Sequence, residues 1–365
     1  MKRLFTTLSK KHVLVFEDLV RLHKPANIRV LSGIQPTGTF HLGNYLGALR
    51  TWKQLVEYVN PANSPEPITR SRLLFSIVDM HSITVRQDPD MLRASVLESA
   101  AAMIACGVDP SRSVLFQQSA VSGHAELAWI LSCSTPLGWL RQMHQFKSKS
   151  EAQKEGTSLG LLSYPVLMAA DVLLYRSTHV PVGEDQLQHL ELTRDIANHF
   201  HSLTTQQSVF QIPTIVYSEA TRVMSLRDAA VKMSKSDPLE ASRILLTDSV
   251  DVIDQKIRKA KTDSIPGISA DPARAEVMNL LTMYAALSNE SIASVAKQFA
   301  DSGHAAFKRS LAEVIQATVV PIGNEISRLK KDEEYLRQVM ELGAEEARTI
   351  AHQTLLDAKR AVGLL

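Results

Sequence analysis

Residues 32–44 carry small and polar side chains in a pattern that can bind phosphate: Ser-Gly-Ile-Gln-Pro-Thr-Gly-Thr-Phe-His-Leu-Gly-Asn. The pattern predicts a strand, a turn and a helix that begins near His41, with Asn44 three residues later on the neighbouring surface of the same turn. A helix N-terminus offers unpaired N–H groups and the positive end of a dipole. Gly43 has no side chain, so a flat base or ribose could approach the helix backbone there. The alternative is a strand-turn-helix whose glycines serve packing only.

A second polar segment, residues 232–238, reads Lys-Met-Ser-Lys-Ser-Asp-Pro. Its two ammonium groups, three residues apart, and its two hydroxyls could form a compact, mobile clamp for a polyphosphate. Such donors would stabilise the negative charge that develops on a leaving pyrophosphate. The alternative is an ordinary solvated polar loop.

A third group of residues could line a pocket for an aromatic ring. Tyr164, Met168 and Asp171 stand at helical spacing on one face. Tyrosine and methionine provide a flat, polarizable wall, and Asp171 would accept a hydrogen bond from an N–H group on such a ring. The alternative is a core stripe in which Asp171 caps a helix or pairs with a cation.

The elements that would position these residues alternate between strand and helix. The helical patterns include one over residues 42–59 and one opened by Asp88-Pro89 and closed by Gly107. Apolar, β-branched runs predict strands at residues 28–34, 73–78, 114–116 and 180–182. This order predicts an α/β fold with a doubly wound, parallel, Rossmann-like sheet over residues 30–247.

Strand patterns disappear after about residue 248. The rest of the chain predicts an all-helical second domain over residues 248–365, with helices at residues 250–260, 273–287, 292–299 and from 305 onward. A small basic cluster lies in the first of these helices and just after it, and consists of Lys256, Arg258, Lys259 and Lys261. It is either a solvated helix face or a contact for RNA.

The N-terminus is the most basic part of the chain. Seven lysines and arginines against Glu17 and Asp18 give the first 30 residues a net charge of +5, compared with +2 for all 365 residues. Basic, Ser/Thr-containing, amphipathic sequence is typical of transit peptides. We therefore expect residues 1–29 to be a presequence for import into the mitochondrial matrix that catalysis does not need. The two acids favour the alternative, a helical N-terminal extension.

Composition restricts the class of protein. The chain is 45% hydrophobic and 21% charged, and no apolar run approaches the roughly 18 residues of a membrane span, so we expect no membrane partner. Cys106 and Cys133 belong to no CxxC pair or histidine-rich cluster, which argues against a structural metal or a disulfide framework.

The two phosphate motifs together resemble the signatures of class I aminoacyl-tRNA synthetases, His-Ile-Gly-His early and Lys-Met-Ser-Lys-Ser late. Residues 232–236 match the second signature at all five positions. Residues 41–44 depart from the His-Ile-Gly-His signature at two positions. Leu42 is a mild change, whereas Asn44 replaces a histidine and can act only by hydrogen bonding. Residues 77–84, 164–171 and 180–186 resemble tryptophanyl-tRNA synthetases of the bacterial and mitochondrial branch, and the similarity extends from about Val30 to the C-terminus.

The resemblance implies a homodimer that uses Mg-ATP to convert L-tryptophan to its adenylate, then loads it onto tRNA(Trp), whose anticodon the helical domain reads. It implies no protein-bound metal. The implied catalytic residues are Gln35, His41, Asn44, Lys232 and Lys235. The implied ATP-binding residues are Gln35, Pro36, Thr37, Gly43, Asn44, Gly183, Glu184, Asp185, Val223, Lys232, Met233, Ser234, Lys235 and Ser236. The implied tryptophan-binding residues are His81, Tyr164, Met168, Asp171 and Gln186.

Other interpretations of these residues remain. His81 could be a core histidine with satisfied hydrogen bonds, and Glu184 and Asp185 could be first-turn acids that suit a helix dipole. A small-molecule nucleotidyltransferase could share the first motif, and a non-enzymatic RNA-binding paralogue could share the fold. Within the class, tyrosine is the rival substrate.

The chain has no domain-sized insertion left for a second, hydrolytic site. We therefore expect selection to occur in the synthetic pocket. An amino acid without an indole N–H would leave the buried Asp171 carboxylate unpaired, a penalty of the kind that can exclude a wrong substrate without editing.

Overall fold

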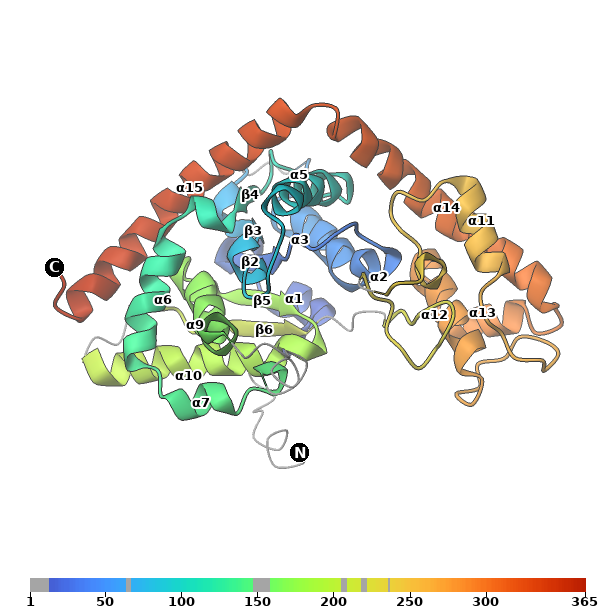
Figure 1. Ribbon diagram of the computed structural model, residues 1–365, viewed down its shortest axis with the longest axis horizontal. Helices are drawn as coiled ribbons and strands as arrows, with labels where there is room; N and C mark the ends of the chain where they lie inside the picture. Colours follow the sequence, from blue (N-terminus) through green and yellow to red (C-terminus); the bar gives the residue numbers. More distant parts are fainter. Residues whose placement is uncertain (1–12, 64–66, 147–157, 205–208, 218–221, 236) are drawn as a thin grey trace.

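The computed structural model describes residues 13–63, 67–146, 158–204, 209–217, 222–235 and 237–365. These residues contain one parallel six-stranded sheet in the order β1-β6-β5-β2-β3-β4 (Figure 1). Its strands are β1 (Val13–Val15), β2 (Val30–Ile34), β3 (Leu73–Ile77), β4 (Val114–Gln117), β5 (His179–Val182) and β6 (Thr214–Tyr217).

Helices surround the sheet and continue into a helical group at one end of the molecule (Figure 1). Those around the sheet are α1 (Phe16–Leu22), α2 (Leu42–Asn44), the π-helical η3 (Tyr45–Leu49), α3 (Arg50–Val59), α4 (Asp79–Ser82), α5 (Pro89–Ala105), α6 (Gly123–Ser134), α7 (Leu137–Arg141), α9 (Leu159–Leu174) and α10 (Leu187–Thr204). Those that follow are α11 (Val250–Arg258), α12 (Ala275–Ser288), α13 (Ile292–Gln298), α14 (His304–Leu329) and α15 (Glu333–Ala361). Short 3-10 turns are η2 (Pro25–Asn27), η4 (Arg70–Arg72), η5 (Gln118–Ala120), η6 (Glu184–Gln186) and η7 (Glu240–Ser242).

The order in which successive strands join the sheet changes side between β2 and β5, although all the strands are parallel. The chain passes from β2 to β3 and β4 on one side, then returns to place β5 on the other side of β2. β2 pairs with β3 along five residues but with β5 only at Val30↔His179. The two strands therefore separate toward their carboxyl ends, at the position where open α/β sheets bind ligands.

The predicted fold class is confirmed, and each of the four predicted strands is present. The helix that Asp88 was expected to open does begin there, since the Asp88 carboxylate accepts from the backbone N–H groups of Asp90 and Met91. Two strands, β1 and β6, were not predicted. None of the described helices is both long and apolar enough to cross a membrane.

The unpredicted strand β1 lies within the expected presequence. It pairs in parallel with β6, from Val13↔Ile215 to Val15↔Tyr217. Leu19 of the following helix α1 is completely buried, and the Tyr58 hydroxyl of α3 donates to the carbonyl oxygen of His23. Residues 13–29 are thus part of the packed structure, and the expected boundary at residue 29 differs from the edge of the fold. Residues 1–12 fall outside the described residues.

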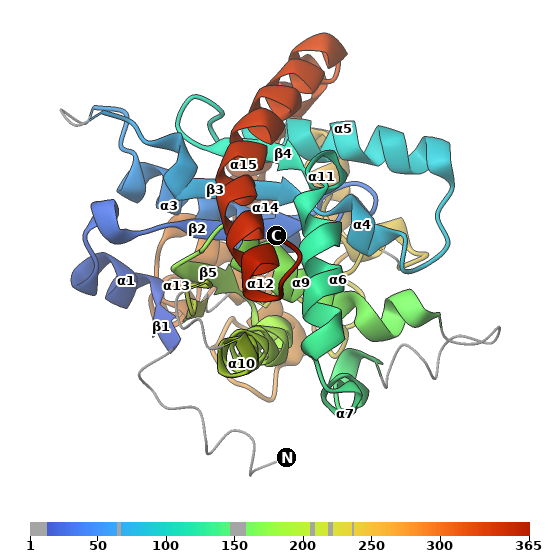
Figure 2. The ribbon, with the colours of Figure 1, turned by 90° about the vertical axis from the view of Figure 1, so that its left-hand side faces the viewer.

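The C-terminal helix α15 also differs from the expected domain boundary. α14 packs along α11 and α12 and also against α5, whereas α15 turns back and lies against β4 and α6 (Figures 1 and 2). The approach to β4 is so close that a Cβ atom on Gly343 would lie 1.9 Å from the carbonyl oxygen of Leu115. The expected helical domain of residues 248–365 therefore divides between α14 and α15, and its last helix covers the sheet.

Two N-terminal truncations should differ in stability. We expect deletion of residues 1–12 to leave the unfolding temperature unchanged, because β1 and α1 remain. Deletion of residues 1–29 should lower the free energy of unfolding by at least about 2 kcal/mol, the value of one buried leucine, because it removes the edge strand and Leu19. Thermal and urea unfolding of both truncated proteins test this, and equal stability would show that residues 13–29 contribute nothing to the fold.

Candidate active site

The first phosphate motif forms the turn and helix start that its sequence predicts. β2 ends at Ile34, and α2 begins at Leu42 with His41 as its N-cap residue. The His41 backbone N–H donates to Oδ1 of Asn44, 3.1 Å away. Because the Asn44 oxygen is used inside the turn, the amide NH₂ group is what this side chain can offer to a phosphate.

Main-chain hydrogen bonds hold the segment that follows the lysine loop against this turn. The N–H of Leu42 donates to the carbonyl oxygen of Ile244, and the N–H of Leu246 donates to that of Phe40, each at 2.8 Å. Hydrogen bonds of the backbone alone therefore hold the two motifs next to each other.

Met233, in the middle of the lysine loop, lies close to the first motif. Its N–H donates to the carbonyl oxygen of Val223 at 3.0 Å, and its side chain is buried. A Cβ atom on Gly43 would lie 3.8 Å from Cβ of Met233 and 3.0 Å from the His41 ring. Val223 and Gly43 thus both lie beside Met233, and Gly43 is in α2.

Lys235 extends from the loop over the first motif. Its Nζ donates to the carbonyl oxygen of Gly38 at 3.2 Å and lies 3.9 Å from the centre of the Phe40 ring. Burial lowers the pKa of Lys235 to about 8, although the charge of Glu98 opposes this shift. Lys232 is exposed. The two lysines that looked alike in sequence therefore occupy different environments.

His41 is electrically neutral at physiological pH. Burial, followed by the charges of Lys235, Arg243 and Lys232, lowers its pKa to about 3. Its buried Nδ1 has no hydrogen-bond partner within the described part of the chain. This ring nitrogen is available to a ligand, and His41 can serve a phosphate as a neutral hydrogen-bonding group but not as a cation.

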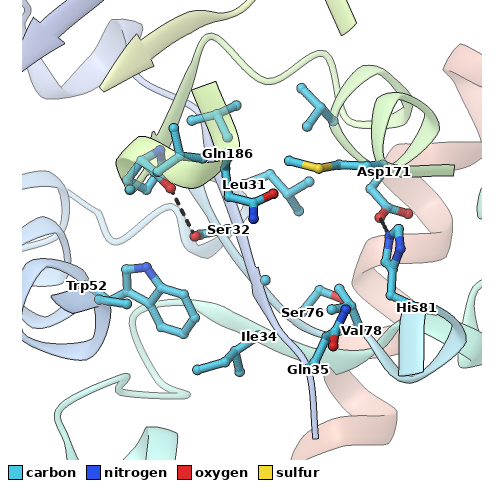
Figure 3. A pocket seen from close by; sticks show the side chains of 18 of the residues that line it. Leu31, Ser32, Ile34, Gln35, Trp52, Ser76, Val78, His81, Asp171 and Gln186 are labelled. Carbon is cyan, nitrogen blue, oxygen red and sulfur yellow. Dashed lines mark hydrogen bonds and ion pairs between the residues drawn. The ribbon is translucent and has the colours of Figure 1, made fainter. Parts of the chain in front are cut away.

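A cavity of about 420 Å³ opens where β2 and β5 separate, between α3 and α9 (Figure 3). Its volume falls within the usual range of small-molecule pockets. The cavity is also lined by the α3 residues Thr51 and Trp52. The expected site residues that line it are Gln35, His81, Tyr164, Met168, Asp171, Gly183 and Gln186.

The remaining expected site residues whose side chains the structure describes lie outside the lining of this cavity. Glu184 and Asp185 are in η6, the turn that follows the cavity residue Gly183. Ser236 falls outside the described residues. The other expected site residues belong to the turn after β2, the start of α2, the lysine loop and the segment just before that loop. They are Pro36, Thr37, His41, Gly43, Asn44, Val223, Lys232, Met233, Ser234 and Lys235. The expected ATP residues are therefore divided between the cavity mouth and the turn beside it.

The structure places Tyr164, Met168 and Asp171 on one helix, α9, and all three side chains line the cavity, as the spacing predicted. The Tyr164 hydroxyl donates to Oε1 of Gln145 at 3.1 Å and also lies 2.7 Å from Nε2 of His189. Burial raises the pKa of Tyr164 to about 12, so the phenol stays protonated.

The Asp171 carboxylate is not the unpaired acceptor that the sequence suggested. His124 Nδ1 lies 2.6 Å from Oδ1, His81 Nε2 lies 2.8 Å from Oδ2, and Gln118 Nε2 donates to both oxygens at 2.8 and 2.9 Å. Burial raises the pKa of Asp171, but the hydrogen bonds from His124 and His81 outweigh it, and the net pKa is about 2. An anion with three donors remains paired even when no indole is bound. The expectation that a wrong amino acid leaves it unpaired is therefore wrong.

Sequence reasoning missed Gln118, His124 and Tyr175. Gln118 begins η5 directly after β4, and a polar residue just beyond a buried parallel strand is a usable signal. Tyr175 lies one helical turn after Asp171, so it shares its face. His124, a lone histidine, carried no such signal. His81 fits both of its interpretations, because it is buried and hydrogen-bonded and also lines the cavity (Figure 3).

Comparisons with known proteins agree with this geometry. The family model of tRNA synthetases class I (W and Y) matches residues 23–320. A tryptophan–tRNA ligase of Nostoc sp. is 47% identical over 92% of this chain and 97% of its own length. The crystal structure of tryptophanyl-tRNA synthetase from Mycoplasma pneumoniae matches with a TM-score of 0.78 and 32% identity, over 92% of this chain and 97% of the other. That from Campylobacter jejuni, complexed with ADP and tryptophan, matches with a TM-score of 0.74 and 31% identity, over 92% of this chain and all of the other.

Proposed function

The chain belongs to the class I tRNA synthetases of the tryptophan and tyrosine group, and we propose that the site described above ligates L-tryptophan to tRNA(Trp) at the expense of ATP. In the first step a tryptophan carboxylate oxygen attacks the α-phosphorus of ATP. The bond to the β-phosphate oxygen breaks, which gives tryptophanyl-adenylate and pyrophosphate. In the second step a hydroxyl of the terminal ribose of tRNA attacks the acyl carbon and AMP leaves.

The chain's own residues position substrates and stabilise charge, and none needs to act as a nucleophile. The start of α2, His41 and Asn44 meet the phosphates from one side, and Lys235 meets them from the other, where pyrophosphate becomes more negative. Mg²⁺ would arrive with ATP as part of that substrate. Tryptophan would occupy the cavity with its ring against Tyr164 and Met168.

One observation carries this function: a cavity that ends at the buried Asp171 carboxylate opens beside a phosphate-binding turn covered by Lys235. The test is ATP–pyrophosphate exchange with each of the twenty amino acids. We expect exchange with tryptophan only. Exchange with tyrosine would identify the sister activity, exchange without any amino acid would indicate a nucleotidyltransferase, and no exchange with any substrate would indicate a binding paralogue.

The anticodon of tRNA would be read by α11–α14, which project from the sheet (Figure 1). The basic cluster offers less charge than its sequence suggests. Lys256 pairs with Asp248 at 2.6 Å and Lys261 pairs with Glu276 at 2.9 Å. Arg258 and Lys259, both exposed, are the members that remain for a phosphate backbone.

Import into the mitochondrial matrix is part of the proposal and rests on residues 1–12 more than on residues 13–29. The first twelve residues carry four basic side chains and no acid, whereas Glu17 and Asp18 lie in α1 of the folded protein. Residues 1–12 fused to a fluorescent reporter should bring it into mitochondria. A reporter that stays in the cytosol, with residues 1–12 or 1–30, would refute import.

A homodimer is also proposed, with a second copy on the surface around α6 and α9. Large apolar side chains are exposed there, including Trp129 at 72% and Leu159 at 76%, and Figure 2 shows α4, α6, α7 and α9 on one side of the sheet. We expect Leu159→Glu to produce monomers in analytical ultracentrifugation. Leu342→Glu on α15, a half-exposed leucine elsewhere, is the matched control and should stay dimeric. A wild-type monomer at micromolar concentration would refute the dimer.

A further inference from the structure

Behind the cavity, two buried side chains connect to Asp171 in series. His124, the second residue of α6, is completely buried, as is Tyr175, which follows α9. Tyr175 Oη lies 2.7 Å from Nε2 of His124, whose Nδ1 lies 2.6 Å from Oδ1 of Asp171. Phe116 packs on both rings, with ring centres 6.1 Å from His124 and 5.7 Å from Tyr175. Neither His124 nor Tyr175 lines the cavity, so neither can touch a ligand in it.

The chemistry of these groups fixes the direction of each hydrogen bond. An ionised carboxylate can only accept, so the proton of a neutral His124 ring is on Nδ1. Its Nε2 is then an acceptor, and the donor is the phenol O–H. Burial, with the nearby charge of Asp171 second, raises the pKa of Tyr175 well above its ordinary value, so the phenol keeps its proton. Tyr175 therefore selects the tautomer in which His124 donates to Asp171.

The three donors of Asp171 differ in their access to the cavity. Only His81 among the three lines the cavity (Figure 3), whereas His124 and Gln118 are not part of its lining. Each Asp171 oxygen accepts from one histidine and from Gln118, so these donors use all of the roughly four acceptor positions of the carboxylate. An indole N–H that enters through the cavity would therefore share Oδ2 with His81, the donor that lines the cavity, or displace it, while His124 and Gln118 keep their hydrogen bonds.

We propose that Tyr175 and His124 are positioning residues for amino-acid selection: the chain of hydrogen bonds from Tyr175 through His124 holds the Asp171 carboxylate so that Oδ2, the oxygen that accepts from the cavity-lining His81, meets the indole N–H. This inference rests on the proposed function and adds a cause for its specificity. Residues that never contact the substrate then contribute to the preference for an amino acid whose side chain carries an N–H donor.

The closing experiment compares tryptophan with 3-(benzothiophen-3-yl)alanine, which keeps the fused ring but has sulfur in place of the N–H. Tyr175→Phe removes one hydroxyl and leaves the His124 Nε2 without its donor. We expect the KM for tryptophan to rise about 10-fold with kcat nearly unchanged, in line with a lost buried hydrogen bond. The preference for tryptophan over the sulfur analogue should fall by a similar factor. Tyr284→Phe, a buried tyrosine of α12 in the helical group, is the matched control and should change neither value.

Two variants of His124 separate positioning from packing. In His124→Asn the amide can still donate to Asp171, whereas His124→Leu cannot, so Asn should keep most of the preference and Leu should lose it. A Tyr175→Phe enzyme with wild-type KM and preference would overturn the proposal. So would a loss shared equally by tryptophan and the sulfur analogue, because that outcome marks a packing role. If the wild-type enzyme shows no tryptophan-dependent exchange, the proposed function fails instead, and the two failures are distinct.

Discussion

Substitution of Lys235 by alanine should slow adenylate formation by about 10²–10³-fold, while the affinity for tryptophan stays within a few-fold of wild type. The ammonium group is partly desolvated, bonded to the Gly38 carbonyl oxygen and placed over Phe40, beside the start of α2. A charge fixed in that position stabilises the departing pyrophosphate more than bound ATP. Single-turnover formation of the adenylate, measured beside tryptophan binding, tests the difference.

Two further lysine variants serve as comparisons. Lys232→Ala should have a smaller effect, because Lys232 is exposed and its charge is screened by water. Lys297→Ala, an exposed lysine of α13, should have none. The transition-state role would be refuted if Lys235→Ala formed adenylate at the wild-type rate once ATP was saturating.

The pKa of Lys235 gives this prediction a pH dependence. The group acts as an ammonium, and its pKa is lowered to about 8, so kcat/KM for ATP should fall as pH rises through about 8. Lys235→Arg keeps its charge at every accessible pH, and its profile should lack that fall. Identical alkaline limbs for the wild-type and arginine enzymes would assign the titration to another group.

Local periodicity was sufficient to predict the helix that carries Tyr164 and Asp171 and the strand that ends before Gln35, because both depend on residues close in sequence. It was not sufficient for β1, whose three residues become a strand only by pairing with β6, some 200 positions later. Long-range pairing of this kind leaves little trace in a short segment.

The electrostatics of the site were also beyond the sequence. His41 and Lys235 are ordinary titratable residues in the printed chain. Burial is the largest cause of the lowered pKa of each, and for His41 the nearby charge of Lys235 is the second. The position of α15 is another case. Its sequence predicts a helix, but only the contact of Gly343 with the Leu115 backbone shows that it belongs to the sheet.

The partners of Asp171 change what its substitution tests. Asp171→Ala removes the acceptor of two buried histidines and Gln118, and breaking a buried, hydrogen-bonded network of this kind costs about 3–5 kcal/mol. The alanine variant should therefore unfold at a lower temperature, whatever its role in recognition. Asp171→Asn keeps the shape and one acceptor oxygen, so it is the better variant for measuring selectivity.

We expect Asp171→Asn to lose about 10²-fold in kcat/KM for tryptophan, the value of a hydrogen bond to a charged acceptor, and to lose most of its preference over tyrosine and phenylalanine. Steady-state kinetics with all three amino acids, beside thermal unfolding, separates recognition from stability. A destabilised variant with wild-type selectivity would limit Asp171 to a structural role.

Acid unfolding gives an independent signature of the Asp171 charge. The folded pKa of about 2 lies below the ordinary value of 3.8, so the ionised carboxylate adds stability that is fully present above about pH 4 and is lost as pH falls toward 2. Asp171→Asn has no such proton to bind, and its stability should fall less over that range than the stability of the wild type. Equal acid sensitivity would mean that Asp171 binds its proton equally well in the folded and unfolded chains. The three donors would then hold a carboxylate whose charge they do not stabilise beyond what water does, and the indole N–H would meet an acceptor equivalent to an ordinary solvated carboxylate.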